Sequence, residues 1–317
     1  MLKVGILGTG FGAVHARIYQ RLPDVEIAGI FGRTPEKLQK LHAELGVPVS
    51  TDSDDLITDP GIDVIDVCLP TALHKDYVIK SLQHQKHVFC ETPVSYSLKD
   101  AAAMQSAAER SGKRVFVDLF FKFSDPHKYA IETVRSGVLG KALTISSSQK
   151  TPPHWGNMGT RQIVQDFMLH NFDFVTEIMG LPQAVAAHGV ATENACVVAT
   201  LRYPQGMAVV ESSTLLPGTF PFNLGFTIVC EKGAISYKGE FGEQTVQRLS
   251  LYTGDTQENI PLPGRDDYEE AIKHVLACIA ADAPQSVLSL DAAVQSLRVV
   301  RATLESLERG CAVSIGG

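Results

Sequence analysis

The sequence of 317 residues predicts an α/β protein: a Rossmann-type doubly wound parallel sheet, then an α+β domain with a large, mainly antiparallel open sheet. Up to residue 122, short runs rich in valine and isoleucine alternate with helix-like stretches, which is typical of parallel strands buried on both faces. After residue 122 the apolar runs are longer and more alternating, and hairpin-like turns separate them. We therefore expect two domains, 1–122 and 123–317, each large enough for its own core.

The elements of the first domain follow from these patterns in order. The runs that predict strands are 2–7, 25–31, 64–69, 87–90 and 115–119, with a weaker one at 48–50. Helical periodicity predicts helices at 13–22, 35–45, 74–83 and 97–111. The second helix has Pro35 in its first position, where a proline costs no backbone hydrogen bond.

The second half predicts a different mixture of elements. Strands are expected at 142–148, 184–188, 196–203, 207–214, 226–231 and 247–252. Helices are expected at 126–136, 166–179, 267–281 and 290–308. The sequence Tyr-Pro-Gln-Gly at 203–206 predicts a hairpin turn between two of the strands.

Composition narrows the classes of function. The 28 basic and 35 acidic residues give a net charge of −7 without a basic block, so nucleic acid is not expected as a direct ligand. No apolar run approaches the roughly 20 residues that span a bilayer, and the first twelve residues read as a strand and a glycine turn, so we expect a cytoplasmic protein. The six cysteines form no CxxC pair and the histidines show no zinc spacing, which favours free thiols and no metal.

A glycine-rich turn directly follows the first strand. It reads Gly8-Thr9-Gly10-Phe11-Gly12-Ala13 and satisfies the pattern GxGxxG/A between a strand and a helix. Glycines there allow a tight turn and a close approach of the backbone to a pyrophosphate, which binds at the positive end of the helix. A turn that binds nothing is the alternative, and a methyltransferase also fits these letters. The context predicts dinucleotide binding.

The end of the second strand favours NADP over NAD. Dinucleotide-binding folds usually place a carboxylate here on the ribose hydroxyls, whereas this chain has Gly32, Arg33 and Thr34. A guanidinium and a hydroxyl suit a ribose 2′-phosphate, because arginine binds phosphate with two parallel hydrogen bonds. Alternatively, Arg33 is solvated and Thr34 caps the next helix.

The carboxyl ends of two further strands supply candidate contacts to the nicotinamide half of the cofactor, because these ends border the ligand crevice. The candidates are Leu69, Pro70, Thr71, His74, Glu91 and Thr92. For His74 the alternative is a helix-start residue without chemistry. We also expect a cis peptide bond before Pro93, since such bonds occur in turns that present backbone to a ligand.

One segment of the second domain carries a possible acid-base pair. Asp166 and His170 are four residues apart, hence on one helical face, where the carboxylate can orient the imidazole and stabilise its protonated form. A buried histidine with local hydrogen bonds is the alternative, and Asp173 is expected to cap or pair structurally. Candidate substrate contacts around the preceding loop are Lys150, His154, Trp155 and Arg161. Trp155 could stack on a sugar face or anchor the core.

Other catalytic patterns are absent from the sequence. TyrxxxLys, GxSxG and HExxH do not occur. The residues that are present together resemble the Gfo/Idh/MocA oxidoreductase family. They are Gly8 to Ala13, Pro70 to His74, Cys90-Glu91-Thr92-Pro93, Gly137-Val138-Leu139-Gly140, Asp166 to Asp173 and the closing helices. The resemblance implies a nicotinamide-binding Rossmann domain, hydride transfer to sugars, cyclitols or polyols, an oligomer formed through the open sheet, and a substrate beside Asp166 and His170.

One residue departs from the family pattern. The family usually has Glu-Lys-Pro, whose lysine assists proton transfer, whereas this chain has Thr92 between Glu91 and Pro93. His170 with Asp166 could do this work alone, or Lys122, which follows the sixth strand, could supply the ammonium. Alternatively, catalysis is weak or lost and the protein is an NAD(P)-binding regulator of the same fold.

The sequence thus predicts an NADP-preferring oxidoreductase that acts on a sugar, cyclitol or related polyol or ketone, in a homodimer or homotetramer. C4 of the nicotinamide would exchange a hydride with the carbinol carbon while His170, held by Asp166, takes or gives the hydroxyl proton. The hydroxyl of Thr92 would orient the cofactor amide or the substrate oxygen.

Overall fold

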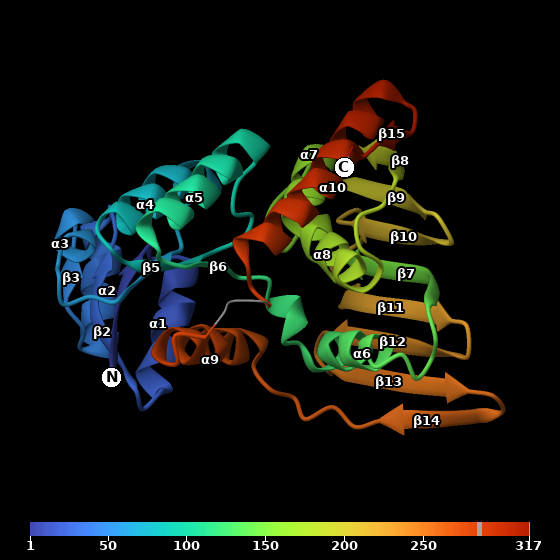
Figure 1. Ribbon diagram of the computed structural model, residues 1–317, viewed down its shortest axis with the longest axis horizontal. Helices are drawn as coiled ribbons and strands as arrows, with labels where there is room; N and C mark the ends of the chain where they lie inside the picture. The colour runs from blue at the N-terminus through green and yellow to red at the C-terminus, as the bar shows by residue number, and fades with distance from the viewer. Residues whose placement is uncertain (284–286, 317) are drawn as a thin grey trace. The chain divides into compact units, whose positions relative to one another are not determined.

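The computed structural model describes residues 1–283 and 287–316 (Figure 1). Its contacts divide the chain into two compact units, which are described separately below. The first contains Met1–Phe123 and Arg265–Val294, and the second contains Ser124–Gly264 and the residues from Gln295 on. Among the described residues, no helix is both long and apolar enough to cross a membrane.

The first unit is built on a parallel sheet of six strands in the order β3-β2-β1-β4-β5-β6. The bounds are β1 Leu2–Leu7, β2 Val25–Phe31, β3 Val49–Ser50, β4 Val64–Val67, β5 His87–Cys90 and β6 Val115–Val117. The strand order reverses between β1 and β4, so a ligand crevice is expected at the carboxyl ends of these strands. The predicted Rossmann sheet is confirmed, including the weak edge strand.

Helices cover this sheet, and most begin and end where local sequence dictates. They are α1 Phe11–Arg21, α2 Pro35–Leu45, α3 Asp54–Ile57, α4 Thr71–Gln83, α5 Leu98–Ser111, η1 Phe120–Lys122 and α9 Asp267–Ala280. Ser97 caps α5 by accepting a hydrogen bond from the backbone of Asp100, and α5 ends at Gly112 in the left-handed conformation. Gly46 ends α2 in the same way.

The expected division at residue 122 needs one change, because 265–294 belongs to the first unit. The apolar face of α9, with Ala271, Ile272 and Val275, is part of the first core. The next segment lies at the free edge of β6, where the backbone of Val117 donates to the carbonyl of Leu288. Burial of these apolar side chains, which the chain order alone does not reveal, places the segment here.

The second unit is built on a sheet of nine strands in the order β14-β13-β12-β11-β7-β10-β9-β8-β15. The bounds are β7 Ala142–Lys150, β8 Ala184–Ala191, β9 Ala195–Tyr203, β10 Gly206–Ser213, β11 Phe222–Cys230, β12 Gly233–Phe241, β13 Val246–Thr253, β14 Thr256–Ile260 and β15 Val313–Ser314. Among the described strands of this sheet, only β7 and β10 pair in parallel, so the predicted mainly antiparallel sheet is confirmed. Strands β12 and β14 were not expected from the sequence. Strand β14 lies at the edge of the sheet and is polar, so its sequence has no alternation of apolar residues that would reveal a strand.

One face of this sheet is covered by helices (Figure 1). They are α6 Asp125–Arg135, α8 Met168–Met179 and α10 Leu290–Arg309, with the short α7 Thr160–Gln162 and the π-helical turn η2 Ile163–Phe167 before α8. Of α10, the residues from Gln295 on belong to this unit. Along β9, Ala195, Val197, Ala199 and Leu201 are fully buried while Val198 is exposed. This alternation is what a sheet with one covered face requires.

Candidate functional site

The glycine turn between β1 and α1 has the shape that a pyrophosphate requires. Gly8 has a φ of +127°, and a Cβ on it would lie 2.3 Å from the carbonyl oxygen of Cys68, so only glycine fits there. A Cβ on Gly12 would lie 3.0 Å from Cγ2 of Ile6, which reflects the close packing of α1 on the sheet. A Cβ on Gly10 would meet no heavy atom within 4 Å, so the backbone is open to a ligand at that point. These positions match the roles of the glycines in dinucleotide-binding turns.

The end of β2 leaves no room for the carboxylate that usually holds a ribose. A Cβ on Gly32 would lie 2.5 Å from Cγ2 of Thr9, so a larger residue here would push against the glycine turn. Arg33 is exposed and has no ion-pair partner among the described residues. Thr34 is the N-cap residue of α2 but its side chain makes no capping hydrogen bond. Both polar groups are therefore available to a ligand.

The segments after β4 and β5 border the same edge of the sheet. Pro70 is exposed, and Thr71 begins α4. His74 points inward: it is fully buried, and its Nε2 lies 2.6 Å from the carbonyl oxygen of Leu69, a hydrogen bond that holds the turn. Burial lowers the pKa of His74, so the imidazole is neutral at pH 7. The expected cis peptide bond before Pro93 is confirmed.

A buried charged cluster, not anticipated from the sequence, lies beside these segments. His15 on α1 is fully buried, and its Nδ1 lies 2.9 Å from Oδ2 of Asp66 on β4. Its Nε2 lies 3.4 Å from Oε1 of Glu91 and 3.6 Å from Oδ2 of Asp118. The thiol of Cys68 lies 3.2 Å from Oδ1 of Asp66, to which it donates. We call His15, Asp66, Cys68, Glu91 and Asp118 the His15 cluster.

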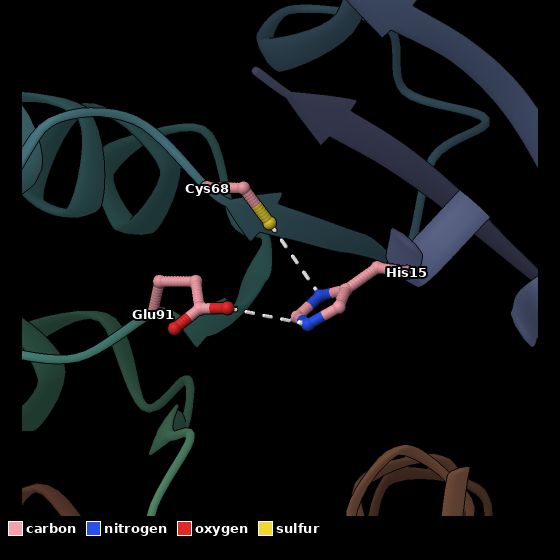
Figure 2. Close-up of side chains that lie close together, drawn as sticks. All are labelled: His15, Cys68 and Glu91. Carbon is pink, nitrogen blue, oxygen red and sulfur yellow. Dashed lines mark hydrogen bonds and ion pairs between the residues drawn. The ribbon is translucent and has the colours of Figure 1, made fainter. Parts of the chain in front are cut away.

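The His15 cluster contains atoms that could bind a metal, but their arrangement disfavours one. Ligand atoms of His15, Cys68 and Glu91 lie within 4.8 Å of one another. Figure 2 shows that Cys68 approaches Nδ1 of the ring whereas Glu91 approaches Nε2. The imidazole thus lies between the two other ligands and fills the space that an ion would need. The His15 cluster is better described as a buried ion network.

The neighbours of His15 determine its protonation. Burial would lower its pKa, but the carboxylates of Asp66 and Asp118 outweigh burial and raise the pKa well above 6.5. Burial also raises the pKa of Cys68, so this group is a neutral thiol and the carboxylates supply the negative charge. Burial, together with the nearby charge of Glu91, raises the pKa of Asp118 to about 7. The imidazole is therefore protonated at pH 7.

In the second unit, His170 lies on α8, and Asp166 lies in the π-helical turn before it. Burial lowers the pKa of His170 to about 4. This is opposite to the protonated imidazole expected from the sequence, and His170 is neutral at pH 7.

A second histidine, not expected from the sequence, lies near His170. His127 on α6 is buried, and burial together with the charge of His170 lowers its pKa to about 3. Its ring packs edge-on against Phe174 at a centroid distance of 4.8 Å, and its Nδ1 lies 3.1 Å from Oγ of Ser124. As expected, Asp173 has a structural contact, a hydrogen bond of 3.2 Å from the hydroxyl of Ser296.

The remaining candidate residues differ in exposure. Trp155 is 58% exposed, with ring edges against Phe167 and Phe222, so a core anchor is excluded. Nζ of Lys150 lies 2.8 Å from Oε2 of Glu211, and both side chains are about one-third exposed. Arg161 forms an exposed ion pair of 2.8 Å with Glu308, and His154 is exposed beside Trp155. In the first unit, Lys122 is buried and its Nζ donates to the carbonyl oxygen of Val287 at 3.1 Å.

Matches to known proteins agree with the Rossmann fold of the first unit. Residues 2–119, which span β1 to β6, match the Gfo/Idh/MocA family, described as an oxidoreductase family with an NAD-binding Rossmann fold. An uncharacterised oxidoreductase, YrbE, of Bacillus subtilis is 28% identical over 99% of this chain and 96% of that protein. A myo-inositol 2-dehydrogenase of Thermotoga maritima is 30% identical over 56% of this chain and 55% of that protein.

Solved structures share the whole fold. An oxidoreductase from Agrobacterium radiobacter, in complex with NAD+, L-tartaric acid and magnesium, superposes with a TM-score of 0.88 at 21% identity, over 99% of this chain and 98% of that one. Levoglucosan dehydrogenase, in complex with NADH and levoglucosan, superposes with a TM-score of 0.83 at 20% identity over the full length of both chains. From the glycine turn, the two sheets and these matches, we conclude that residues 2–119 form a Rossmann domain of the Gfo/Idh/MocA oxidoreductase family and that the whole chain is similar to oxidoreductases.

Proposed function

We propose that this protein is an NADP-preferring oxidoreductase that transfers a hydride between nicotinamide and the carbinol carbon of a sugar, cyclitol or related polyol, or the matching ketone. The observation that carries the cofactor preference is the end of β2, where Gly32 excludes a carboxylate and Arg33 is exposed. A 2′-phosphate beside Arg33 would gain charge-assisted hydrogen bonds. The inositol and levoglucosan dehydrogenases among the similar proteins support the substrate class.

The residues of the first unit would hold the dinucleotide. Gly8, Gly10 and Gly12 shape the pyrophosphate turn, and the positive amino end of α1 directly follows it. The backbone after β4, from Leu69 to Thr71, would border the nicotinamide half. The bound nicotinamide supplies or accepts the hydride.

The proton would be handled by His170. A neutral imidazole can accept the hydroxyl proton of an alcohol, and burial keeps His170 in this form at pH 7. Asp166 would bind substrate beside it, together with Lys150, Trp155 and Arg161. Thr92 would orient the cofactor amide or the substrate oxygen. Lys122 is the second candidate for the proton-handling group, because it follows β6 at the carboxyl edge of the parallel sheet.

A catalytically weak NAD(P)-binding regulator is the alternative, and Thr92 in the place of the family lysine favours it. The two functions differ in turnover and not in cofactor binding. The oxidoreductase predicts that NADP+ is reduced in the presence of at least one compound in a panel of sugars and cyclitols. The regulator predicts binding of the same cofactor without turnover on the whole panel.

The cofactor preference is tested by titrating NADPH and NADH against the wild type and the variant Arg33→Ala. Loss of hydrogen bonds to a charged group costs about 1.5–3 kcal/mol, so NADPH should bind roughly ten- to a hundred-fold more weakly while NADH is unaffected. Lys37→Ala is the matched control, because Lys37 is another exposed cation on α2. Equal effects of both variants, or of Arg33→Ala on both cofactors, would contradict the assignment. Binding of S-adenosylmethionine in place of either cofactor would indicate methyl transfer.

We also propose that the open face of the nine-stranded sheet supports a homodimer or homotetramer. Exposed apolar side chains on its strands include Leu143 on β7, Val198 on β9 and Met207 on β10. Light scattering should give two or four times the chain mass of 34.3 kDa. A single-chain mass at micromolar concentration would contradict this proposal.

A further inference from the structure

The His15 cluster lies where three strands of the first unit end. Asp66 is on β4, Glu91 follows β5, and Asp118 follows β6. All three carboxyl groups converge on the imidazole of His15, which comes from α1, the helix that begins at the glycine turn. The imidazole therefore joins the glycine turn to the segments after the strands.

The contacts with Asp66 and Glu91 favour a proton on each nitrogen of His15. Nδ1 donates to Asp66, so in a neutral ring Nε2 would present a lone pair to Oε1 of Glu91 at 3.4 Å and to Oδ2 of Asp118 at 3.6 Å. A lone pair facing carboxylate oxygens is repulsive, whereas an N–H facing them is attractive. The upward shift of the His15 pKa agrees with this geometry.

Other polar groups also face the ring from each element around it. Tyr19 of α1 shares a hydrogen bond with Asp66, and Cys68 donates to the same carboxylate. Tyr268 of α9 packs at a centroid distance of 6.2 Å from the imidazole, and Phe89 of β5 stacks on it at 5.5 Å. Burial raises the pKa of both tyrosines and of Cys68, so these groups stay neutral near pH 7 and the carboxylates alone face the imidazolium with negative charge.

The same carboxyl group that faces His15 also holds the backbone of the next residue. Oε2 of Glu91 accepts a hydrogen bond from the backbone N–H of Thr92 at 2.9 Å, while Oε1 faces Nε2 of His15. Glu91 is only 13% exposed, so water replaces neither contact easily. Loss of the imidazolium charge would leave a buried carboxylate without its cation and would weaken its hold on Thr92.

We propose that His15 is a positioning residue whose imidazolium, through Glu91, holds the Thr92 backbone in place for the nicotinamide end of the dinucleotide, so that cofactor affinity falls when the imidazolium loses its proton. This inference rests on the proposed function, because it assumes that the dinucleotide binds at this edge of the sheet. It assigns His15 no contact with the cofactor or the substrate.

The test is the dissociation constant of NADPH, measured by cofactor fluorescence between pH 7 and 10. In the wild type, affinity should be constant at first and then fall by up to about tenfold per pH unit above the titration of the imidazolium, as expected for one linked proton. His15→Gln should bind NADPH more weakly and without this dependence on pH. His42→Gln is the matched control, because His42 is an exposed histidine of α2, and it should keep the wild-type profile.

A second variant keeps the test valid if His15→Gln does not fold. Asp118→Asn preserves the shape of the side chain but removes one of the two carboxylates that face Nε2, so the break in the profile should move to lower pH. Three outcomes would overturn this inference and leave the proposed function standing. They are an unchanged break in the profile of Asp118→Asn, a wild-type profile in His15→Gln, and a flat profile in the wild type. Failure to bind either NADPH or NADH at any pH would contradict the proposed function as well.

Discussion

The sharpest test of the cofactor site is to place the missing carboxylate at the end of β2. The variant Gly32→Asp puts a Cβ 2.5 Å from Cγ2 of Thr9, inside the glycine turn. To restore an ordinary contact of 3.4 Å, that methyl group must move by about 0.9 Å. Because Thr9 is part of the turn that would hold the pyrophosphate, we expect both NADPH and NADH to bind more weakly.

The magnitudes follow from this contact. Overpacking of a close-packed site costs about 1–3 kcal/mol of unfolding free energy, which lowers the melting temperature of a unit of this size by about 2–12 °C. Thr9→Ser removes the methyl group and keeps the hydroxyl, so Thr9→Ser combined with Gly32→Asp should recover most of the loss. A contact of 3.1 Å with Cδ2 of Leu38 remains and accounts for an incomplete recovery.

The double variant should also reverse the cofactor preference. A carboxylate about 4 Å from the 2′-phosphate of NADPH would repel it by roughly 1–4 kcal/mol, which is about a fivefold loss or more. NADH carries no such phosphate and can instead donate ribose hydroxyls to the carboxylate. The assays are thermal melting and fluorescence titration of the wild type, both single variants and the double variant.

Two results would refute this reasoning. If Gly32→Asp alone has the melting temperature of the wild type and keeps its affinity for both cofactors, the steric argument from Thr9 is wrong. If the folded double variant still prefers NADPH, the electrostatic argument for the end of β2 is wrong.

Three further predictions concern the histidines and the buried carboxyl group. His170→Gln should lower kcat by about 10²–10⁴ without changing NADPH affinity, and wild-type turnover in this variant would exclude His170 as the proton-handling group. The pKa of Asp118 is raised to about 7, so the native state binds an extra proton between about pH 4 and 7. The contribution of Asp118 to stability is therefore lost as the pH rises through this range. In urea unfolding, the free energy of unfolding of Asp118→Asn should increase relative to that of the wild type from pH 4 to 7. The pKa of His127 is lowered to about 3, so its contribution to stability is present above pH 6.5 and is lost as the pH falls. The free energy of unfolding of His127→Phe should therefore increase relative to that of the wild type from pH 6.5 to 4. A constant difference between the two proteins would contradict the burial of His127 as a neutral ring.

The elements that the sequence predicted well are those that depend on near neighbours. The βα alternation of the first unit, the glycine turn at Gly8 and the hairpin between Tyr203 and Gly206 each follow from local periodicity or turn chemistry. Strand β14 was missed because its side chains are polar, and an edge strand is identified by its pairing with β13. The place of α9 was missed because its apolar face is covered by residues far away in the chain.

The candidate site shows the same division. The residues of the cofactor turn were predicted because a short motif carries them, whereas His15, Asp66 and Asp118 were not. A visible clue existed, since Asp66 interrupts the apolar run of β4 and has no role there unless another polar group meets it. Its partner His15 is 51 residues away, and only the pairing of β1 with β4 brings them together.

By itself, the sequence determined the Rossmann sheet, the glycine turn and the absence of a carboxylate at Gly32, because each depends on residue type over a few positions. Tertiary structure alone decided the protonation of the histidines. It made His15 an imidazolium among three carboxyl groups, and it made His170 neutral by burial. The physical reason is that a pKa depends on burial and on charges a few ångströms away, which the folded chain assembles from distant segments.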